Sequence, residues 1–201
     1  MEFKIYNNLF NNKVSIPENL VKEIHKTVCN SILSDKEIYT KEEKKKMIKA
    51  REINSFEKML NKMWIICAFK EDKLLGFCGI KKTGSMYEYK ILQVLPESRG
   101  LGLAKILTNI RDQEAIKINL KEVWLTSLCF PKTIEFHFKR GFQIAGNQQG
   151  LNFSVRMKKE LKKDLPIDFE LVKIYSNINW IESKNDKNKQ NENKFYLCNR
   201  K

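Results

Sequence analysis

The chain of 201 residues has little of what several kinds of protein site require. It contains only 2 histidines, and its 5 cysteines include no pair with the C-x-x-C spacing, so the sequence predicts no metal site. No apolar run approaches the length that crosses a membrane, and the first residues lack the apolar segment of a secretion signal. We therefore expect a cytoplasmic protein with free thiols and no membrane partner.

What the sequence does contain indicates a folded, basic domain. A hydrophobic content of 42% and an aromatic content of 10% are typical of a chain with a packed core. The formal net charge of +14 suits an anionic partner, either a polyphosphate cofactor or a nucleic acid. The same charge also fits a compositional bias whose lysines lie on a solvated surface, and both interpretations stay open.

Glycine is scarce, at 8 residues in all, yet two of them lie two positions apart in the segment "VLPESRGLGLAKIL". Gly100 and Gly102 follow an apolar run and precede an amphipathic one. Glycine at a helix start allows close approach of the backbone, and the unpaired N–H groups of the first turn favour an anion. The segment therefore predicts a phosphate-binding loop.

Hydrophobic periodicity predicts alternating strands and helices along most of the chain. The predicted order is strand, two helices, three strands, helix, strand, helix and two strands, at residues 2–6, 16–33, 40–63, 63–69, 74–82, 86–95, 98–118, 122–128, 132–140, 142–146 and 151–159. This order indicates an α/β domain with a mixed sheet over residues 1–160. Residues 161–201 form a C-terminal appendage, with two apolar segments around a polar Lys/Asn-rich loop at 183–194.

Two motifs identify a family resemblance. After a strand that ends in V-x-P, the run from Arg99 to Ala104 has the spacing R-x-x-G-x-A and resembles the acetyl-CoA-binding signature of the GCN5-related N-acetyltransferase (GNAT) superfamily. The segment "TIEFHFKRGF", residues 133–142, is similar to the A-I-x-x-Y-x-x-x-G-F segment of the same family. The third glycine of a dinucleotide-binding loop and the G-K-[ST] of a P-loop are both missing.

The resemblance implies a mixed, mostly antiparallel central sheet flanked by helices, and acetyl-CoA as cosubstrate. It implies that main-chain N–H groups of the glycine loop hold the pyrophosphate, while the free edge of the preceding strand binds the pantetheine arm. The Val94 N–H would then be the oxyanion donor. The implied cofactor-binding residues are Leu92, Gln93, Val94, Arg99, Gly100, Leu101, Gly102, Leu103, Ala104 and Ser127.

Two side chains are candidates for acid–base work. Glu88 matches the position of the general base in histone-acetylating members, and the alternative is an exposed strand glutamate facing Lys90. His137 stands where many members have a tyrosine near the coenzyme sulfur, and imidazole can supply a proton near neutral pH. The alternative for His137 is a half-buried packing residue, in which case Tyr87 or Tyr89 would be the acid.

The expected function is N-acetyl transfer from acetyl-CoA to a primary amine by direct attack. The acceptor is left open between a small amine, a protein and an aminoacyl-tRNA, and the basic surface favours an acidic or neutral acceptor over a polyamine. That surface also makes RNA or tRNA a candidate partner, and a homodimer stays open. The alternatives are an acetyl-CoA sensor without catalysis and a basic nucleic-acid-binding module on the same fold.

Overall fold

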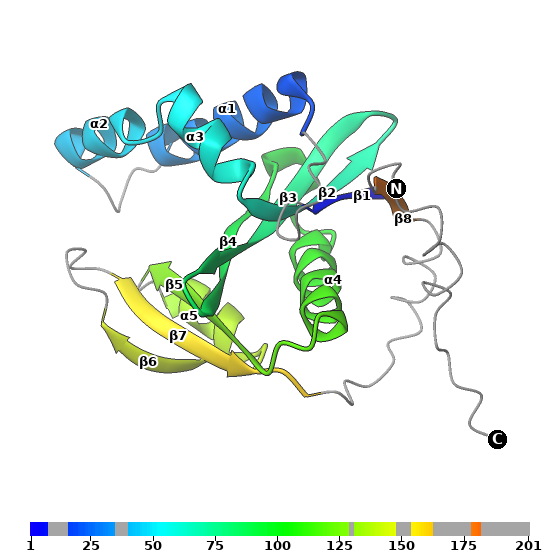
Figure 1. Cartoon of the computed structure of the whole chain (residues 1–201). Coiled ribbons are helices and arrows are strands. Elements are labelled where there is room, and N and C mark those ends of the chain that lie inside the picture. The colour runs from blue at the N-terminus through cyan, green and yellow to red at the C-terminus, as the bar shows by residue number, and fades with distance from the viewer. Residues whose placement is uncertain (8–15, 35–39, 129–130, 148–153, 163–177, 182–201) are drawn as a thin grey trace.

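The apolar runs of the sequence become the strands of a single sheet, with helices on both of its faces (Figure 1). The structure is a computed structural model, and it describes residues 1–7, 16–34, 40–128, 131–147, 154–162 and 178–181. The predicted polar loop at 183–194 and most of the NQQG turn lie outside these ranges.

The described helices and strands follow the predicted order closely. They are β1 (Glu2–Asn7), α1 (Glu18–Ser34), α2 (Lys41–Lys49), α3 (Ile53–Leu60), β2 (Met63–Lys70), β3 (Lys73–Thr83), β4 (Met86–Val94), the 3-10 turn η1 (Pro96–Ser98), α4 (Leu103–Lys117), β5 (Glu122–Leu128), α5 (Pro131–Phe138), β6 (Gln143–Asn147), β7 (Ser154–Glu160) and β8 (Ile178–Ile181).

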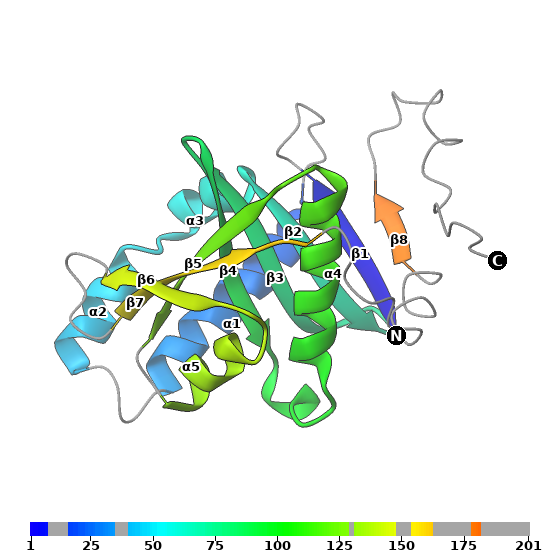
Figure 2. The ribbon, with the colours of Figure 1, turned by 90° about the horizontal axis from the view of Figure 1, so that it is seen from below.

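The strand order within the described residues is β6-β7-β5-β4-β3-β2-β1-β8. Neighbouring strands are antiparallel except for β4 with β5 and β1 with β8, which are parallel. The prediction of a mixed, mostly antiparallel sheet is therefore confirmed. Strand β8 comes from the C-terminal segment and pairs with the edge strand β1 (Figure 2), so part of the predicted appendage extends the sheet.

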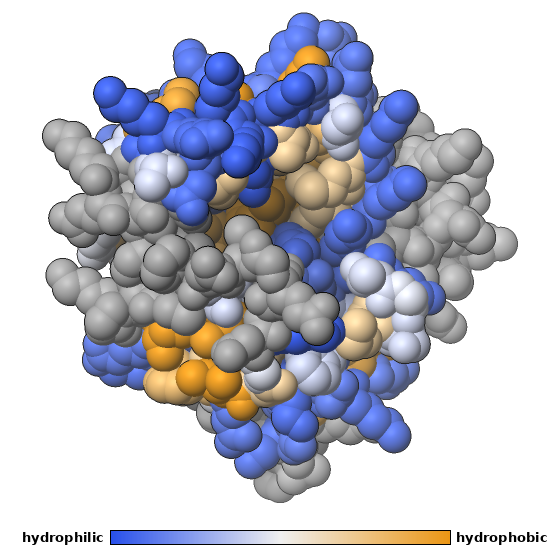
Figure 3. Space-filling view, turned by 90° about the vertical axis from the view of Figure 1, so that its left-hand side faces the viewer, coloured by the Kyte–Doolittle hydropathy of each residue, from blue (hydrophilic) through white to orange (hydrophobic). Residues whose placement is uncertain are grey.

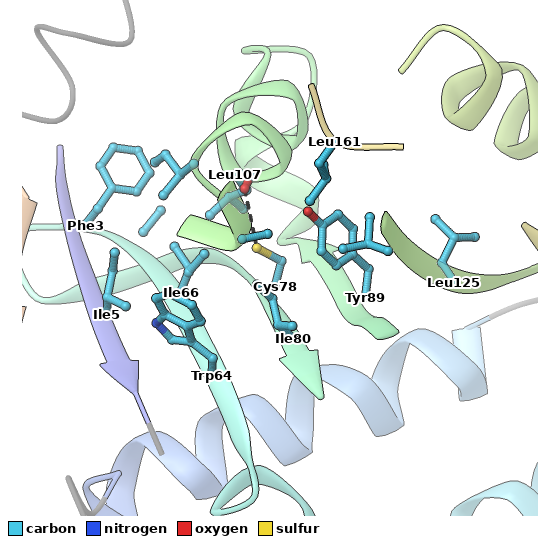
Figure 4. Close-up of a cluster of buried hydrophobic side chains, with 14 of the residues drawn as sticks. Phe3, Ile5, Trp64, Ile66, Cys78, Ile80, Tyr89, Leu107, Leu125 and Leu161 are labelled. Carbon is cyan, nitrogen blue, oxygen red and sulfur yellow. Dashed lines mark hydrogen bonds between the residues drawn. The ribbon is translucent and has the colours of Figure 1, made fainter. Parts of the chain in front are cut away.

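Two hydrophobic clusters lie on opposite faces of the sheet. One contains Ile66, Cys78, Ile80 and Tyr89 from the strands and Leu107 from α4 (Figure 4). The other joins the opposite face of β2 and β3 to the buried sides of α1 and α3. Helix α4 thus covers one face, and α1 and α3 cover part of the other, so the layers follow from the alternation of each strand.

One predicted element was wrong in its extent. The sequence predicts a single helix over 40–63, whereas the structure has α2 and α3 with a break between them. Arg51 holds the break, because its guanidinium donates to the Met47 carbonyl while its own carbonyl lies 2.6 Å from His25 Nε2 on α1. The predicted capping box of Thr40 and Glu43 is confirmed at the start of α2.

Candidate functional site

Strand β4 carries a bulge at the start of the segment that the resemblance assigns to the cofactor, residues 92–94. Between the register pairs Gly79–Lys90 and Phe77–Gln93, β3 contributes one residue and β4 contributes two. Ile91 is one of those two, and its φ of 47° is costly for a β-branched residue. The extra residue shifts the alternation, so that Leu92 packs on the α4 side of the sheet, as Tyr89 does.

Beyond the bulge, β4 and β5 part from each other. Their register consists of two pairs, Glu88–Trp124 and Tyr89–Leu125, although β4 continues to Val94 and β5 to Leu128. Residues 126–128 of β5 remain paired with β7 on their other side. The inner edges of β4 and β5 therefore face a widening gap, as the resemblance implies.

The Val94 main chain points into this gap. The Leu95 N–H donates to the Leu75 carbonyl at 2.9 Å, which makes the pair Gly76–Val94 a non-hydrogen-bonded pair of the antiparallel ladder. Residues in such a pair turn their N–H and C=O groups away from each other, so those of Val94 face the β5 side. The Val94 carbonyl accepts from Arg99 Nε at 3.2 Å. The Val94 N–H has no partner among the described residues.

The glycine loop also has unused donors. Gly100 and Gly102 have φ values of 81° and 74°, and a Cβ at either position would meet no atom within 4 Å. The first α4 bond runs from the Ile106 N–H to the Gly102 carbonyl, and in the described chain the N–H groups of residues 100–105 have no partner. Such a set of open donors at a helix start fits a phosphate.

Two details of the predicted loop need correction. Helix α4 begins at Leu103 and not at residue 98, because both glycines are left-handed and interrupt the helical backbone. The Arg99 N–H is not free for a ligand, since it donates to the Pro96 carbonyl at 3.2 Å.

Leu101 is 77% exposed at the tip of the loop, whereas Leu103 is buried in the α4 core. Ala104 and Gln93 are half-buried.

Glu88 lies on the face of β4 that is turned away from α4. Its carboxylate accepts from the Lys90 ammonium and, at 3.3 Å, from the Thr126 hydroxyl, and its side chain is 21% exposed. The contact with Lys90 is the one that the alternative interpretation names, while the partial exposure beside the β4–β5 gap suits a base. The structure does not test the catalytic role, which stays a prediction.

His137 is half-buried on α5, between the edges of the Phe136 and Phe142 rings. Burial, followed by the positive charges of Arg111 and Arg140, lowers the pKa of His137 to about 4. At neutral pH the ring is therefore neutral, and it lacks the imidazolium proton that the sequence argument invokes. A neutral ring can still donate a hydrogen bond, so its place near the sulfur stays a prediction.

The remaining predicted residues are placed as follows. Ser127 is buried near the end of β5, where the strand pairs with β7 on one side and faces the gap on the other. Its contact with pantetheine stays a prediction. In the described part of the chain, no group of three or more His, Cys, Asp or Glu residues could hold a metal ion. None of the described helices is long and apolar enough to span a bilayer.

The sequence analysis missed a buried polar network between α4 and the sheet. Asp112 accepts from the Tyr89 hydroxyl at 2.7 Å and from the Lys159 ammonium, and the Arg111 guanidinium lies 3.9 Å above the Tyr89 ring centre. Burial and the nearby Asp112 charge raise the pKa of Tyr89 well above its usual value. The signal was present, because Arg111 stands four residues after the core residue Leu107.

The face of the sheet opposite α4 is only partly covered by helices. Helices α1 and α3 pack over β2 and β3, whereas β5 and β7 present Trp124 and Arg156 on this side. Figure 3 shows this side of the molecule, with a hollow between the hydrophilic surface of the α1–α3 half above and the β5–β7 half below. Glu88 lies on the same face, so a molecule in the hollow could reach both the carboxylate and the β4–β5 gap.

Comparisons with known proteins agree with this geometry. A family model described as the acetyltransferase (GNAT) family matches residues 28–142, more than half of the chain. Among curated proteins none matches significantly.

Two solved structures illustrate the likeness in fold. The chain is similar to the PaiA N-acetyltransferase from Thermoplasma acidophilum in complex with coenzyme A, with 19% identity, a TM-score of 0.59, and coverage of 80% of this chain and 99% of that chain. It is also similar to an aminoglycoside 6'-acetyltransferase type Ii, with 18% identity, a TM-score of 0.58, and coverage of 81% and 98%. At these identities the likeness shows the fold.

Proposed function

The chain belongs to the acetyltransferase (GNAT) family, and from this premise we propose that it transfers acetyl from acetyl-CoA to a primary amine by direct attack. One observation carries the proposal: the gap between β4 and β5 opens beside a glycine loop whose N–H groups are unused. A pyrophosphate on the loop and an extended pantetheine along β4 would fill these two features together.

Each proposed role uses a group with the required chemistry. The N–H groups of residues 100–105 bind the pyrophosphate, and the β4 edge beyond the bulge bonds the pantetheine amides. The Val94 N–H, which points into the gap, stabilises the oxyanion that forms at the thioester carbonyl. The Arg99 guanidinium fixes the Val94 peptide by binding its carbonyl.

The reaction itself forms one C–N bond and breaks one C–S bond. Glu88 takes a proton from the acceptor ammonium, directly or through a water, and the free amine attacks the thioester carbon. The tetrahedral intermediate collapses with the departure of the coenzyme A thiolate, and the second proton of the attacking nitrogen passes to that thiolate, so that the products are the neutral amide and the free thiol. The neutral His137 ring donates a hydrogen bond to that thiolate, which suits a leaving group that needs no strong acid.

The first test is a calorimetric titration with acetyl-CoA, followed by measurement of thiol release with neutral amines, amino acids and aminoacyl-tRNA. We expect binding, and thiol release with one acceptor class. Binding without release from any amine would support a sensor instead, and absence of binding would overturn the proposed cradle. RNA binding that weakens steeply with salt would favour the nucleic-acid module.

A pair of glycine variants tests the cradle itself. Gly102→Val places a β-branched side chain where the phosphate is proposed, and we expect a loss of acetyl-CoA affinity of about 100-fold or more. Gly84 is the matched control, because it has a φ of 60°, also has open space around a Cβ, and lies in the β3–β4 turn. Both variants carry left-handed strain, so an equal loss of affinity in Gly84→Val would refute the cradle.

A further inference from the structure

Side chains from four strands form a row on the open face of the sheet. The register places Lys81 of β3 beside Glu88 of β4, Glu88 beside Trp124 of β5, and Trp124 beside Lys158 of β7. One step closer to the gap, Thr126 pairs with Arg156. Because the Thr126 hydroxyl also bonds the Glu88 carboxylate, these two rows form one surface, which we call the acceptor face.

Arg156 is held in a fixed orientation on this face. Its guanidinium lies 4.5 Å from the centre of the Trp124 ring, and Nη2 lies 3.1 Å from the Met86 sulfur. Trp124 is itself oriented by a bond from its Nε1 to the Glu122 carboxylate at 2.9 Å. No carboxylate among the described residues forms an ion pair with Arg156.

The charges of the acceptor face do not balance. Among the described residues of its two rows Glu88 is the one carboxylate, and Lys90 forms an ion pair with it, while Lys81, Lys158 and Arg156 add positive charge around it. Glu122 and Glu160 pair with each other on the same side of the sheet, but they lie outside the two rows, on the far side of Trp124 from the gap. A bound acceptor would therefore meet an excess of positive charge next to the place where its amine reacts.

We propose that the acceptor amine carries an anionic group, a carboxylate or a phosphate, and that Arg156 binds this group on the acceptor face. This inference rests on the proposed acetyl transfer to an amine. A guanidinium presents two parallel N–H donors that match the oxygens of either anion. Stacking on Trp124 fixes the orientation of these donors before the ligand binds. Arg156 is then a specificity-determining residue.

The spacing of the strands sets the size of the acceptor. Arg156 is two strands away from Glu88 and two residues further toward the gap, a separation of roughly 12 Å between Cα atoms. Both side chains reach into the space between, since Glu88 bonds Thr126 and Arg156 leans over Trp124. A compact acceptor, with a short spacer between its amine and its anionic group, fits this distance.

The test uses coenzyme A thioethers that join the sulfur through an acetyl spacer to an amine. Three adducts differ only in the amine: β-alanine ends in a carboxylate, O-phosphoethanolamine in a phosphate, and propylamine in a methyl group. Each is titrated calorimetrically against the full chain. We expect an anionic adduct to bind about tenfold more tightly than the propyl adduct or better, and the tighter anionic adduct identifies the preferred group.

Two variants assign that preference to a residue. Arg156→Gln keeps most of the length of the side chain and removes its charge, and we expect the three adducts to bind it within about twofold of one another. Lys70→Gln removes the same charge from the exposed end of β2, away from the acceptor face, and we expect it to retain the preference. Urea unfolding of both variants checks that they remain folded.

The outcomes separate this inference from the proposed function. Equal binding of anionic and propyl adducts, or a preference that survives in Arg156→Gln, would overturn the role of Arg156. Thiol release from acetyl-CoA is measured separately, so release with neutral amines but without anion preference would leave the transferase proposal intact. Absence of thiol release would overturn that proposal, while the adduct affinities would still decide the anion site. A chain that binds no adduct overturns the anion site, and one that also releases no thiol overturns both.

Discussion

Strand β4 separates two carboxylates that have the same kinds of hydrogen-bond partner. On the open face, Glu88 accepts from the Lys90 ammonium and the Thr126 hydroxyl. On the α4 side, Asp112 accepts from the Lys159 ammonium and the Tyr89 hydroxyl. Glu88 and Tyr89 are consecutive, so the alternation of one strand directs the two groups to opposite faces.

The two sites differ in how their partners are held. The Asp112 and Lys159 side chains are 8% and 11% exposed; their ion pair joins α4 to β7 directly, and the Tyr89 hydroxyl adds a bond from β4 to Asp112. The Glu88 and Lys90 side chains are 21% and 32% exposed, and they come from the same strand. A buried pair between elements cannot lose one partner without leaving a charge unsolvated, whereas an open pair can exchange its partner for water or a substrate. We therefore expect a structural role for the Asp112 site, while the catalytic role of Glu88 stays a prediction.

The largest effect that we expect comes from Asp112→Asn. This change leaves the Lys159 ammonium without its carboxylate in a buried position, and we expect a loss of about 3 kcal/mol in the free energy of unfolding. Urea denaturation of the full chain, with the slope compared to the parent chain, measures it.

The same chemical change at Glu88 is the control for stability. We expect Glu88→Gln to lower the free energy of unfolding by about 0.5 kcal/mol or less, because its ion pair is accessible to water. Equal losses in the two variants would mean that burial does not distinguish the sites.

The two variants should rank in the opposite order when turnover is measured, with the larger loss in Glu88→Gln. We expect Glu88→Gln to reduce the rate of thiol release at saturating amine by about 100-fold, the lower range for loss of a general base, while acetyl-CoA affinity stays unchanged. In Asp112→Asn, the fraction that remains folded should retain turnover within about threefold, since Asp112 does not reach the open face. An unaffected rate in Glu88→Gln would exclude Glu88 as the base and leave positioning as the main source of catalysis.

The backbone geometry of the glycine loop could be predicted because it depends on local residue types, while its role in cofactor binding stays a prediction. Gly100 and Gly102 stand out in a chain with 8 glycines, and Pro96 marks the end of β4. Both glycines adopt the left-handed conformation that their residue type permits, and the N–H groups behind them are unpaired. Local sequence was sufficient there.

The acceptor half could not be predicted, since it depends on which strands become neighbours. Trp124 and Arg156 are far apart in sequence, and only the insertion of β7 between β5 and β6 brings them together. The bulge at Ile91 could not be predicted either, because an isoleucine gives no indication of a φ of 47°. The buried pair Arg111 and Asp112 was missed for a related reason: a charged residue on a helix is usually solvated, and its burial depends on partners from other elements.

A smaller effect on stability than that of Asp112→Asn concerns pH. His137 lies on the buried side, with a pKa lowered to about 4 in the folded chain against about 6.5 when unfolded. Between these values the unfolded chain binds a proton that the folded chain does not, so stability falls as the pH drops from about 6.5 to about 4. The full shift corresponds to ~3 kcal/mol, and partial exposure of the ring reduces our expectation to ~1–2 kcal/mol.

Substitution by a ring that does not titrate isolates this contribution. His137→Phe keeps the edge contacts with Phe136 and Phe142, and its free energy of unfolding should lose that part of the acid dependence. If the parent chain and the variant weaken equally between pH 6.5 and pH 4, the pKa of His137 is not lowered in the folded chain, and the expectation is wrong. If only the parent weakens, burial of the ring, together with the positive charges of Arg111 and Arg140, disfavours the charged form of His137 in the folded chain. The part of this effect that comes from the two guanidinium groups would also stabilise a thiolate formed beside the ring.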